Sequence, residues 1–215
     1  MSLKNPVAPK RMLIALKQAL PSLYQFLQEN PHVGVNHRDI QKARVKLWLP
    51  VYIGSVTLPK SKKKRVDARP RLSAKRVAWL CFLKTRNGVN VGVELKTDKS
   101  RAVHHQFQQG EPIHNTFARL RTASRNPRLL RAVYTGRLHS MPGLYFSALW
   151  FKSPSREIFA SLVRVGKELK AGGLYTRTEV VAVLKDELSR RKEAHQIILA
   201  RKREFARGRK DENSQ

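Results

Sequence analysis

The sequence predicts an α+β protein in which a small, mostly antiparallel sheet is covered by helices and followed by a basic C-terminal helix. Three observations carry this prediction: an apolar stripe with helical spacing in residues 9–28, an Asn-Gly hairpin signal within residues 77–96, and a capping box at residues 176–179. Hydrophobic residues make up 41% of the 215 residues, which is enough for a core. We therefore expect one domain over residues 1–200 and a basic, flexible tail at residues 201–215.

The first expected element is a helix over residues 9–28. Its apolar residues recur at spacings of three and four, which gives the helix one face suited to a core. Pro21 lacks an amide hydrogen, so we expect it to kink the helix or to divide it in two. Asn30-Pro31 then ends the helix.

Residues 45–53 are expected to form a strand, because apolar residues alternate along them. Pro50 would confine this strand to an edge of the sheet or to a bulge. Trp48 and Tyr52 share a face with Lys46, which suits stacking on unpaired bases, although such residues more often belong to a core. Residues 59–74 carry a run of bases without apolar periodicity, which predicts a mobile basic loop.

The hairpin signal is the dipeptide Asn87-Gly88 between two apolar runs, residues 77–84 and 89–96. Asn-Gly favours a two-residue type I′ turn, since both central residues need a positive φ. The first run is apolar on both of its faces. We therefore expect it to be a central strand that is covered on both sides.

Residues 97–113 are polar and are expected to form a loop or an irregular helix. A short helix is expected over residues 116–123. Asn126-Pro127 combines a good N-cap with a proline at the first helical position, which predicts a second short helix. This helix would run to about Tyr134 and stop near Gly136.

The apolar run at residues 144–151 lies between two turn signals and predicts another strand that is buried on both faces. Ser153-Pro154 fits the start of a further helix, which would end at Gly172-Gly173. Thr176 and Glu179 form the capping box of the last helix.

Basic residues dominate the charge of the chain. Its 44 Lys and Arg stand against 15 Asp and Glu, which gives a formal net charge of +29. The bases are spread over segments that also carry apolar residues, and no acidic residue occurs between Glu111 and Glu157. A folded basic surface of this kind indicates a polyanion partner. The single cysteine, Cys81, excludes a disulfide framework and a cysteine-based zinc site, and no run of 18 apolar residues exists that would span a membrane.

We expect a non-enzymatic nucleic-acid-binding protein that neutralises phosphates with dispersed Lys and Arg. RNA is favoured over DNA as the partner, together with other proteins of a ribonucleoprotein such as a ribosome. The expected contacts lie in an arginine-rich stretch, whose guanidinium groups suit phosphate, in the basic loop, and near the end of the last helix. These candidate residues are Arg119, Arg121, Arg125, Arg128, Arg131 and Arg137, then Lys60, Lys62, Lys63, Lys64, Arg65, Arg69 and Arg71, and finally Arg201, Lys202 and Arg203.

Glu94-Leu95-Lys96 offers a second interpretation. It resembles the E-x-K half of the signature of PD-(D/E)xK nucleases. In that family an Asp on the preceding strand and the Glu hold a metal, and the Lys lies near the attacked phosphate. Residues 77–84, the preceding strand here, contain no acid, so the resemblance covers three residues. The alternative function is a metal-dependent nuclease or another DNA-processing protein of a mobile element or defence system, with Glu94 and Lys96 as its catalytic residues. The main interpretation includes no metal and no cofactor.

A cytoplasmic location is expected, because the N-terminus lacks the apolar core and cleavage site of a secretory signal. The first 28 residues contain bases and no acid, which leaves a mitochondrial location open, and the basic loop leaves a nuclear one open. The first helix, with its apolar stripe and flanking bases, would also suit an anionic membrane surface. Core packing is the better use of that stripe, so no membrane partner is expected.

Overall fold

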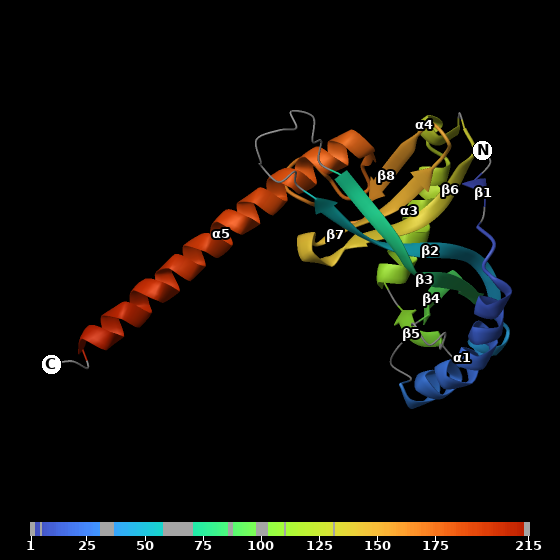
Figure 1. The fold of residues 1–215 in the computed structure, drawn as a ribbon. Coiled ribbons are helices and arrows are strands. Elements are labelled where there is room, and N and C mark those ends of the chain that lie inside the picture. Colours follow the sequence, from blue (N-terminus) through green and yellow to red (C-terminus); the bar gives the residue numbers. More distant parts are fainter. Residues whose placement is uncertain are drawn as a thin grey trace.

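The computed structural model describes residues 3–4, 6–30, 37–57, 71–85, 88–97, 103–109, 111–130 and 132–212. These residues form a mixed, mostly antiparallel open sheet with helices packed against it, which confirms the predicted α+β class (Figure 1). Within the described ranges the sheet has nine strands, more than the small sheet that the sequence suggests.

The strands are β1 (Leu3–Lys4), β2 (Arg44–Thr57), β3 (Arg71–Thr85), β4 (Gly88–Thr97), β5 (Val103–Gln109), β6 (Tyr134–Met141), β7 (Phe146–Lys152), β8 (Glu157–Ser161) and β9 (Leu174–Thr176). The helices are α1 (Lys10–Glu29), α2 (His37–Gln41), α3 (Glu111–Ser124), α4 (Pro127–Leu130) and α5 (Arg177–Glu212). The strand order is β5-β4-β3-β2-β6-β7-β8-β9, and β1 pairs with β6 outside this path. β2 and β6 run parallel, as do β1 and β6, and the other neighbouring strands run antiparallel.

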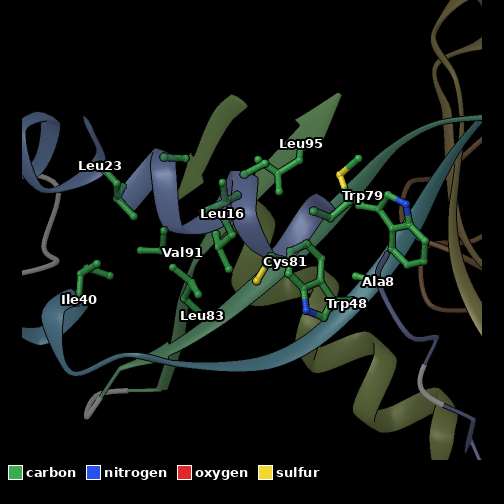
Figure 2. Close-up of a cluster of buried hydrophobic side chains, with 14 of the residues drawn as sticks. Ala8, Leu16, Leu23, Ile40, Trp48, Trp79, Cys81, Leu83, Val91 and Leu95 are labelled. Carbon is green, nitrogen blue, oxygen red and sulfur yellow. The ribbon is translucent and has the colours of Figure 1, made fainter. Parts of the chain in front are cut away.

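Helix α1 covers one face of β3 and β4. It runs through Pro21 as one helix, so the predicted division does not occur. Leu16 and Leu23 of α1 pack over Leu83 and Val91 of the sheet (Figure 2). Trp48 and Trp79 complete this core. Their ring centroids lie 6.5 Å apart at an interplanar angle of 81°. Trp48 is therefore a core residue and does not offer its ring to a partner.

β3 is the central strand that its sequence predicts. Trp79, Cys81 and Leu83 are buried on the α1 side, while Leu80 and Phe82 are buried on the other side, against α3. Burial raises the pKa of the Cys81 thiol to about 12, because the thiolate would lose its hydration. Cys81 is thus part of the core and not a reactive group.

The β3–β4 hairpin forms with a register that differs from the predicted one by one residue. Thr85 pairs with Gly88, so the two connecting residues are 86 and 87, which lie outside the described residues, and Gly88 belongs to β4. The register shifts between Leu83 and Lys84, where β4 contributes one extra residue. This irregularity moves the connection by one position, because a bulge places two residues of one strand opposite one of the other.

Pro50 does not place β2 at an edge of the sheet, since β2 lies between β3 and β6. The parallel pairing with β6 starts at Val51, directly after the proline, so the missing amide hydrogen does not interrupt that pairing. A register shift against β3 follows between Val51 and Tyr52. The extra residue at this shift is Val77 of β3, and Pro50 pairs regularly with Trp79, so Pro50 occupies neither the edge nor the bulge that its sequence predicts.

Two predictions for the middle of the chain are wrong. Within residues 97–113, the range Val103–Gln109 is a strand, β5, which pairs along the outer edge of β4. Asn126 caps α4 as expected, by accepting a hydrogen bond from Arg128 N–H at 2.9 Å, but α4 ends at Leu130. Tyr134 begins β6 and is buried in the core below α3, because a parallel strand beside β2 buries this aromatic ring better than a short surface helix would.

The helix expected from Ser153-Pro154 to Gly172 does not form either. Ser153 caps a tight turn: its Oγ accepts a hydrogen bond from Arg156 N–H at 3.0 Å, and its own N–H donates to Arg156 O at 2.9 Å. The chain then returns as β8, whose Phe159 pairs with Trp150 of β7. A serine in this position favours a turn as readily as a helix start. The turn forms here because it lets the chain pair with the edge of β7.

α5 begins at the predicted capping box. Glu179 N–H donates to Thr176 Oγ1 at 3.3 Å, and the Glu179 carboxylate accepts from Thr176 N–H at 2.6 Å. This hydrogen bond from the Thr176 backbone lowers the pKa of Glu179. Val180 and Leu184 are buried against β7 and β8, and α5 then extends well beyond the sheet (Figure 1). Its backbone continues to Glu212, through most of the segment for which the sequence predicts a flexible tail.

Replacing Thr176 by Ala should lower the free energy of unfolding by about 1 kcal/mol, because the first turn of α5 loses its cap. Urea denaturation followed by circular dichroism measures this change. Thr178→Ala is the matched control, since Thr178 is an exposed threonine in the same turn and makes no cap. Equal destabilisation by both substitutions would contradict a stabilising role of the capping box.

Candidate nucleic-acid interface

One face of the sheet brings aromatic and basic side chains together at the middle strands. The strand register places Tyr52 beside Arg76 of β3 and His139 of β6, and it places Arg137 beside Trp150 of β7. Adjacent positions in neighbouring strands point to the same side, so these residues share a face. We call the exposed and half-buried part of this face, with its one buried ring, the basic-aromatic strip. Its members are Tyr52, Arg76, Arg137, Trp150 and Lys152.

Cation–π contacts hold the centre of this strip. The Arg137 guanidinium carbon lies 5.1 Å from the centroid of the Tyr52 ring and 4.7 Å from that of Trp150. Lys152 Nζ lies 5.5 Å from the same Trp150 ring. Arg76 lies over Trp79 at 5.3 Å and is exposed. The rings thus orient these cations: Arg76 and Lys152 are exposed, whereas Arg137 is half-buried.

A pocket of about 190 Å³ adjoins the strip. Two ion pairs lie at it: Lys152 Nζ to Glu157 Oε1 and Arg177 Nη1 to Glu157 Oε2, both 3.2 Å long. Arg177, at the start of α5, also donates to the carbonyl oxygen of Leu72 at 3.0 Å. We call this hollow the His139 pocket. Its lining residues are Leu72, Ala74, His139, Trp150, Lys152, Glu157, Phe159 and Arg177.

His139 is the most unusual residue of the pocket. Its side chain is fully buried, and neither ring nitrogen has a hydrogen-bond partner among the residues that the structure describes. Burial lowers the pKa of His139 to about 4, and the Glu157 carboxylate opposes this shift only in part. The imidazole is therefore neutral near pH 7, with one nitrogen as a donor and the other as an acceptor.

The arginine-rich stretch does not form the single surface that its spacing suggests. α3 ends at Ser124 and α4 begins at Pro127, so Arg121, Arg125 and Arg128 do not share one helical face, although all three are exposed. Both helices pack on the face of the sheet that carries Leu80 and Phe82. Arg137 lies in the strip on the opposite face. Arg119 is half-buried, and Arg131 lies outside the described residues.

A second hollow of about 460 Å³ lies beside Arg128. Arg156 and Glu179 line it as well, together with Tyr134 and Tyr175. The hydrogen bonds from Thr176 are the main cause of the lowered pKa of Glu179, and the charge of Arg128 adds to it. One of the predicted arginines thus shares this hollow with an acid of α5.

The predicted basic loop lies mostly outside the described residues, and this holds for Lys60, Lys62, Lys63, Lys64, Arg65 and Arg69. Its last four residues, 71–74, are not loop but the start of β3. The segment leaves the sheet after Thr57 and re-enters it at Arg71, next to Leu72 of the His139 pocket. Arg201, Lys202 and Arg203 belong to the helical backbone of α5, and their side chains lie outside the described part.

The Glu94 and Lys96 side chains are bound to their own neighbours. Lys96 Nζ lies 3.2 Å from Glu94 Oε1, and Gln108 of β5 donates to Glu94 Oε2 at 2.7 Å. Glu94 is buried, with 8% of its surface exposed. Over the described ranges of the chain, no group of three or more His, Cys, Asp or Glu is arranged to hold a metal ion.

Sequence reasoning found Arg137 and noted Tyr52, but it missed the other members of this site. Trp150 and Lys152 are two residues apart on a strand, a spacing that predicts a shared face, but the predicted buried strand covers only residues 144–151 and does not include Lys152. Arg177 lies within the capping-box segment, which the sequence identifies only as a helix start. His139 offered no sequence signal, because its importance comes from the pocket around it.

In comparisons with protein-family models, with curated proteins and with solved structures, nothing matches the chain. No helix in the part of the chain described above is both long and apolar enough to cross a lipid bilayer.

Proposed function

We propose that this protein binds nucleic acid without catalysing a reaction on it, and that it prefers RNA as a component of a ribonucleoprotein. The observation that carries the proposal is the net charge of +29 on a chain that folds around three hydrophobic clusters. A folded body with such a charge attracts polyanions over its whole surface. Lys and Arg side chains then displace the counterions of the phosphate backbone, which supplies most of the affinity.

The basic-aromatic strip supports an RNA preference. Single-stranded RNA exposes bases that stack on aromatic rings and on guanidinium groups, whereas duplex DNA keeps its bases stacked inside. The Tyr52 ring is half-buried beneath the Arg137 guanidinium, so the plane that a base can reach is the exposed Arg76 guanidinium, which lies over the Trp79 ring. This cation can contact a phosphate while its ring partner keeps it oriented.

The test is direct binding of labelled single-stranded RNA, double-stranded RNA and duplex DNA at physiological salt with Mg²⁺ present. Single-stranded RNA is expected to bind most tightly, and every strand is expected to stay intact. Tighter binding of duplex DNA would contradict the RNA preference. Weak and equal binding of all three would contradict the proposal as a whole.

The same experiment addresses the alternative of a metal-dependent nuclease. Cleavage that requires Mg²⁺ and disappears in Glu94→Gln would support that alternative. Gln108→Leu is a useful companion variant, because it removes the hydrogen bond to Glu94 and keeps the carboxylate. A nuclease would keep at least part of its activity in this variant.

A further inference from the structure

The His139 pocket has the size of a site for one flat ring. A cavity of about 150 Å³ holds a benzene molecule, so a volume of 190 Å³ has room for a pyrimidine. Leu72, Ala74 and Phe159 form the apolar part of its lining, and charged side chains form much of the rest. The pocket also depends on Gly54: a Cβ at this position would contact His139 Nε2 and would lie 2.6 Å from His139 Cε1.

Buried polar atoms of two residues that line the pocket define what such a ring must offer. In the described part of the chain, the two nitrogens of His139 and Nε1 of Trp150 are buried without a hydrogen-bond partner. A neutral imidazole presents one donor and one acceptor, and the indole presents a donor. A phosphate can only accept from these groups, whereas the edge of a nucleobase both donates and accepts. The unpaired atoms therefore match a base better than an anion.

Three charged side chains, Lys152, Glu157 and Arg177, belong to the lining of the pocket. The side chains of Lys152 and Arg177 are 43% and 49% exposed, and both pair with Glu157. One carboxylate between two cations leaves one positive charge at this place. Arg137 adds a further cation in the adjacent strip.

We infer that the His139 pocket takes the base of one unpaired nucleotide, with the phosphate of that nucleotide beside Lys152 and Arg177. This inference rests on the proposed function, since it names the part of the nucleic acid that is recognised at one place on the protein. Base recognition there is expected to add to the general attraction between the basic surface and the phosphates.

The test compares oligouridylate with a ribose-phosphate chain of the same length that lacks bases, at about 150 mM salt. Both strands carry the same phosphates, so a difference in Kd reports on the bases. Oligouridylate is expected to bind the wild-type protein about tenfold more tightly. Ala74→Phe fills the pocket from an exposed position, so it should abolish this difference and leave binding of the abasic chain unchanged.

Ser73→Phe is the matched control. Ser73 precedes Ala74 on β3, is exposed, and lies on the opposite face of the strand, where its hydroxyl pairs with Ser55 Oγ at 2.8 Å. This variant should keep the tenfold difference, and circular dichroism checks that both variants fold. Equal binding of the two strands to the wild type, or a difference that survives Ala74→Phe, overturns the inference and leaves the proposed function in place. Failure of both strands to bind overturns both.

Discussion

The affinity for single-stranded RNA is expected to fall by about 10³–10⁵ between 50 and 200 mM salt, the range for a protein that makes about 6–10 phosphate contacts. The physical reason is counterion release: each Lys or Arg that neutralises a phosphate frees a condensed cation, and added salt opposes that release. The chain has 44 Lys and Arg to supply such contacts. Fluorescence anisotropy at several salt concentrations gives the slope of log K against log salt, and this slope reports the number of contacts.

Substitutions of two arginines, one inside the strip and one outside it, test whether RNA contacts the strip in particular. Arg76 is exposed in the strip, so Arg76→Gln should reduce the slope by about one. Arg191 serves as the control, because its guanidinium is already bound by the Glu187 carboxylate at 2.9 Å and by the carbonyl oxygen of Gly143 at 2.8 Å. Arg191→Gln should leave the slope unchanged. An equal change in both variants would mean that only total charge matters.

Acidification is expected to destabilise the folded protein through His139. The folded state holds the pKa of this residue at about 4, below the value of 6.5 that applies to the unfolded chain. As pH falls from about 6.5 to about 4, His139 binds a proton in the unfolded chain but stays neutral in the folded protein. The free energy of unfolding should therefore fall by about 2 kcal/mol from this residue between pH 7 and pH 4.5, with no further loss well below pH 4.

Urea denaturation at several pH values measures this contribution as the difference between the wild type and His139→Phe. The variant should lack the histidine component of the pH dependence, because phenylalanine does not titrate. His195→Gln is the control, since His195 is exposed on α5 and folding does not remove its hydration. Should the Phe variant fail to fold, NMR of the histidine rings in the wild type gives the answer. A His139 ring that becomes protonated near pH 6.5 would refute the predicted destabilisation.

Two of the predicted helix caps form as the sequence predicts. Thr176 and Glu179 form their capping box, and Asn126 caps α4, because these hydrogen bonds join residues two or three positions apart. Such local interactions are set by the residue types and their spacing alone. The central position of β3 was predicted for a related reason: a strand that is apolar on both faces is stable only where both are covered.

The elements that were wrong are those whose partners lie far away in the sequence. β5 has a polar sequence and forms because the edge of β4 offers hydrogen bonds. β8 has a sequence that suits a helix, and Ser153 resembles a helix cap, yet the chain turns at Ser153 and pairs with β7. An unpaired strand edge outweighs a modest local preference, since each backbone group that pairs there avoids an unsatisfied hydrogen bond.

In the candidate site, too, some properties follow from the sequence alone and others from contacts between distant segments. Composition alone determined that this is a strongly basic protein with enough apolar residues for a core, because both properties depend only on the residues present. Only the tertiary structure decided that Arg137 joins Tyr52 and Trp150, and that His139 is buried beside Gly54. These residues come from strands β2, β6 and β7, and their proximity follows from the parallel pairing of β2 with β6. That pairing depends on how α3 and α4 carry the chain across the sheet, which no local pattern in the sequence encodes.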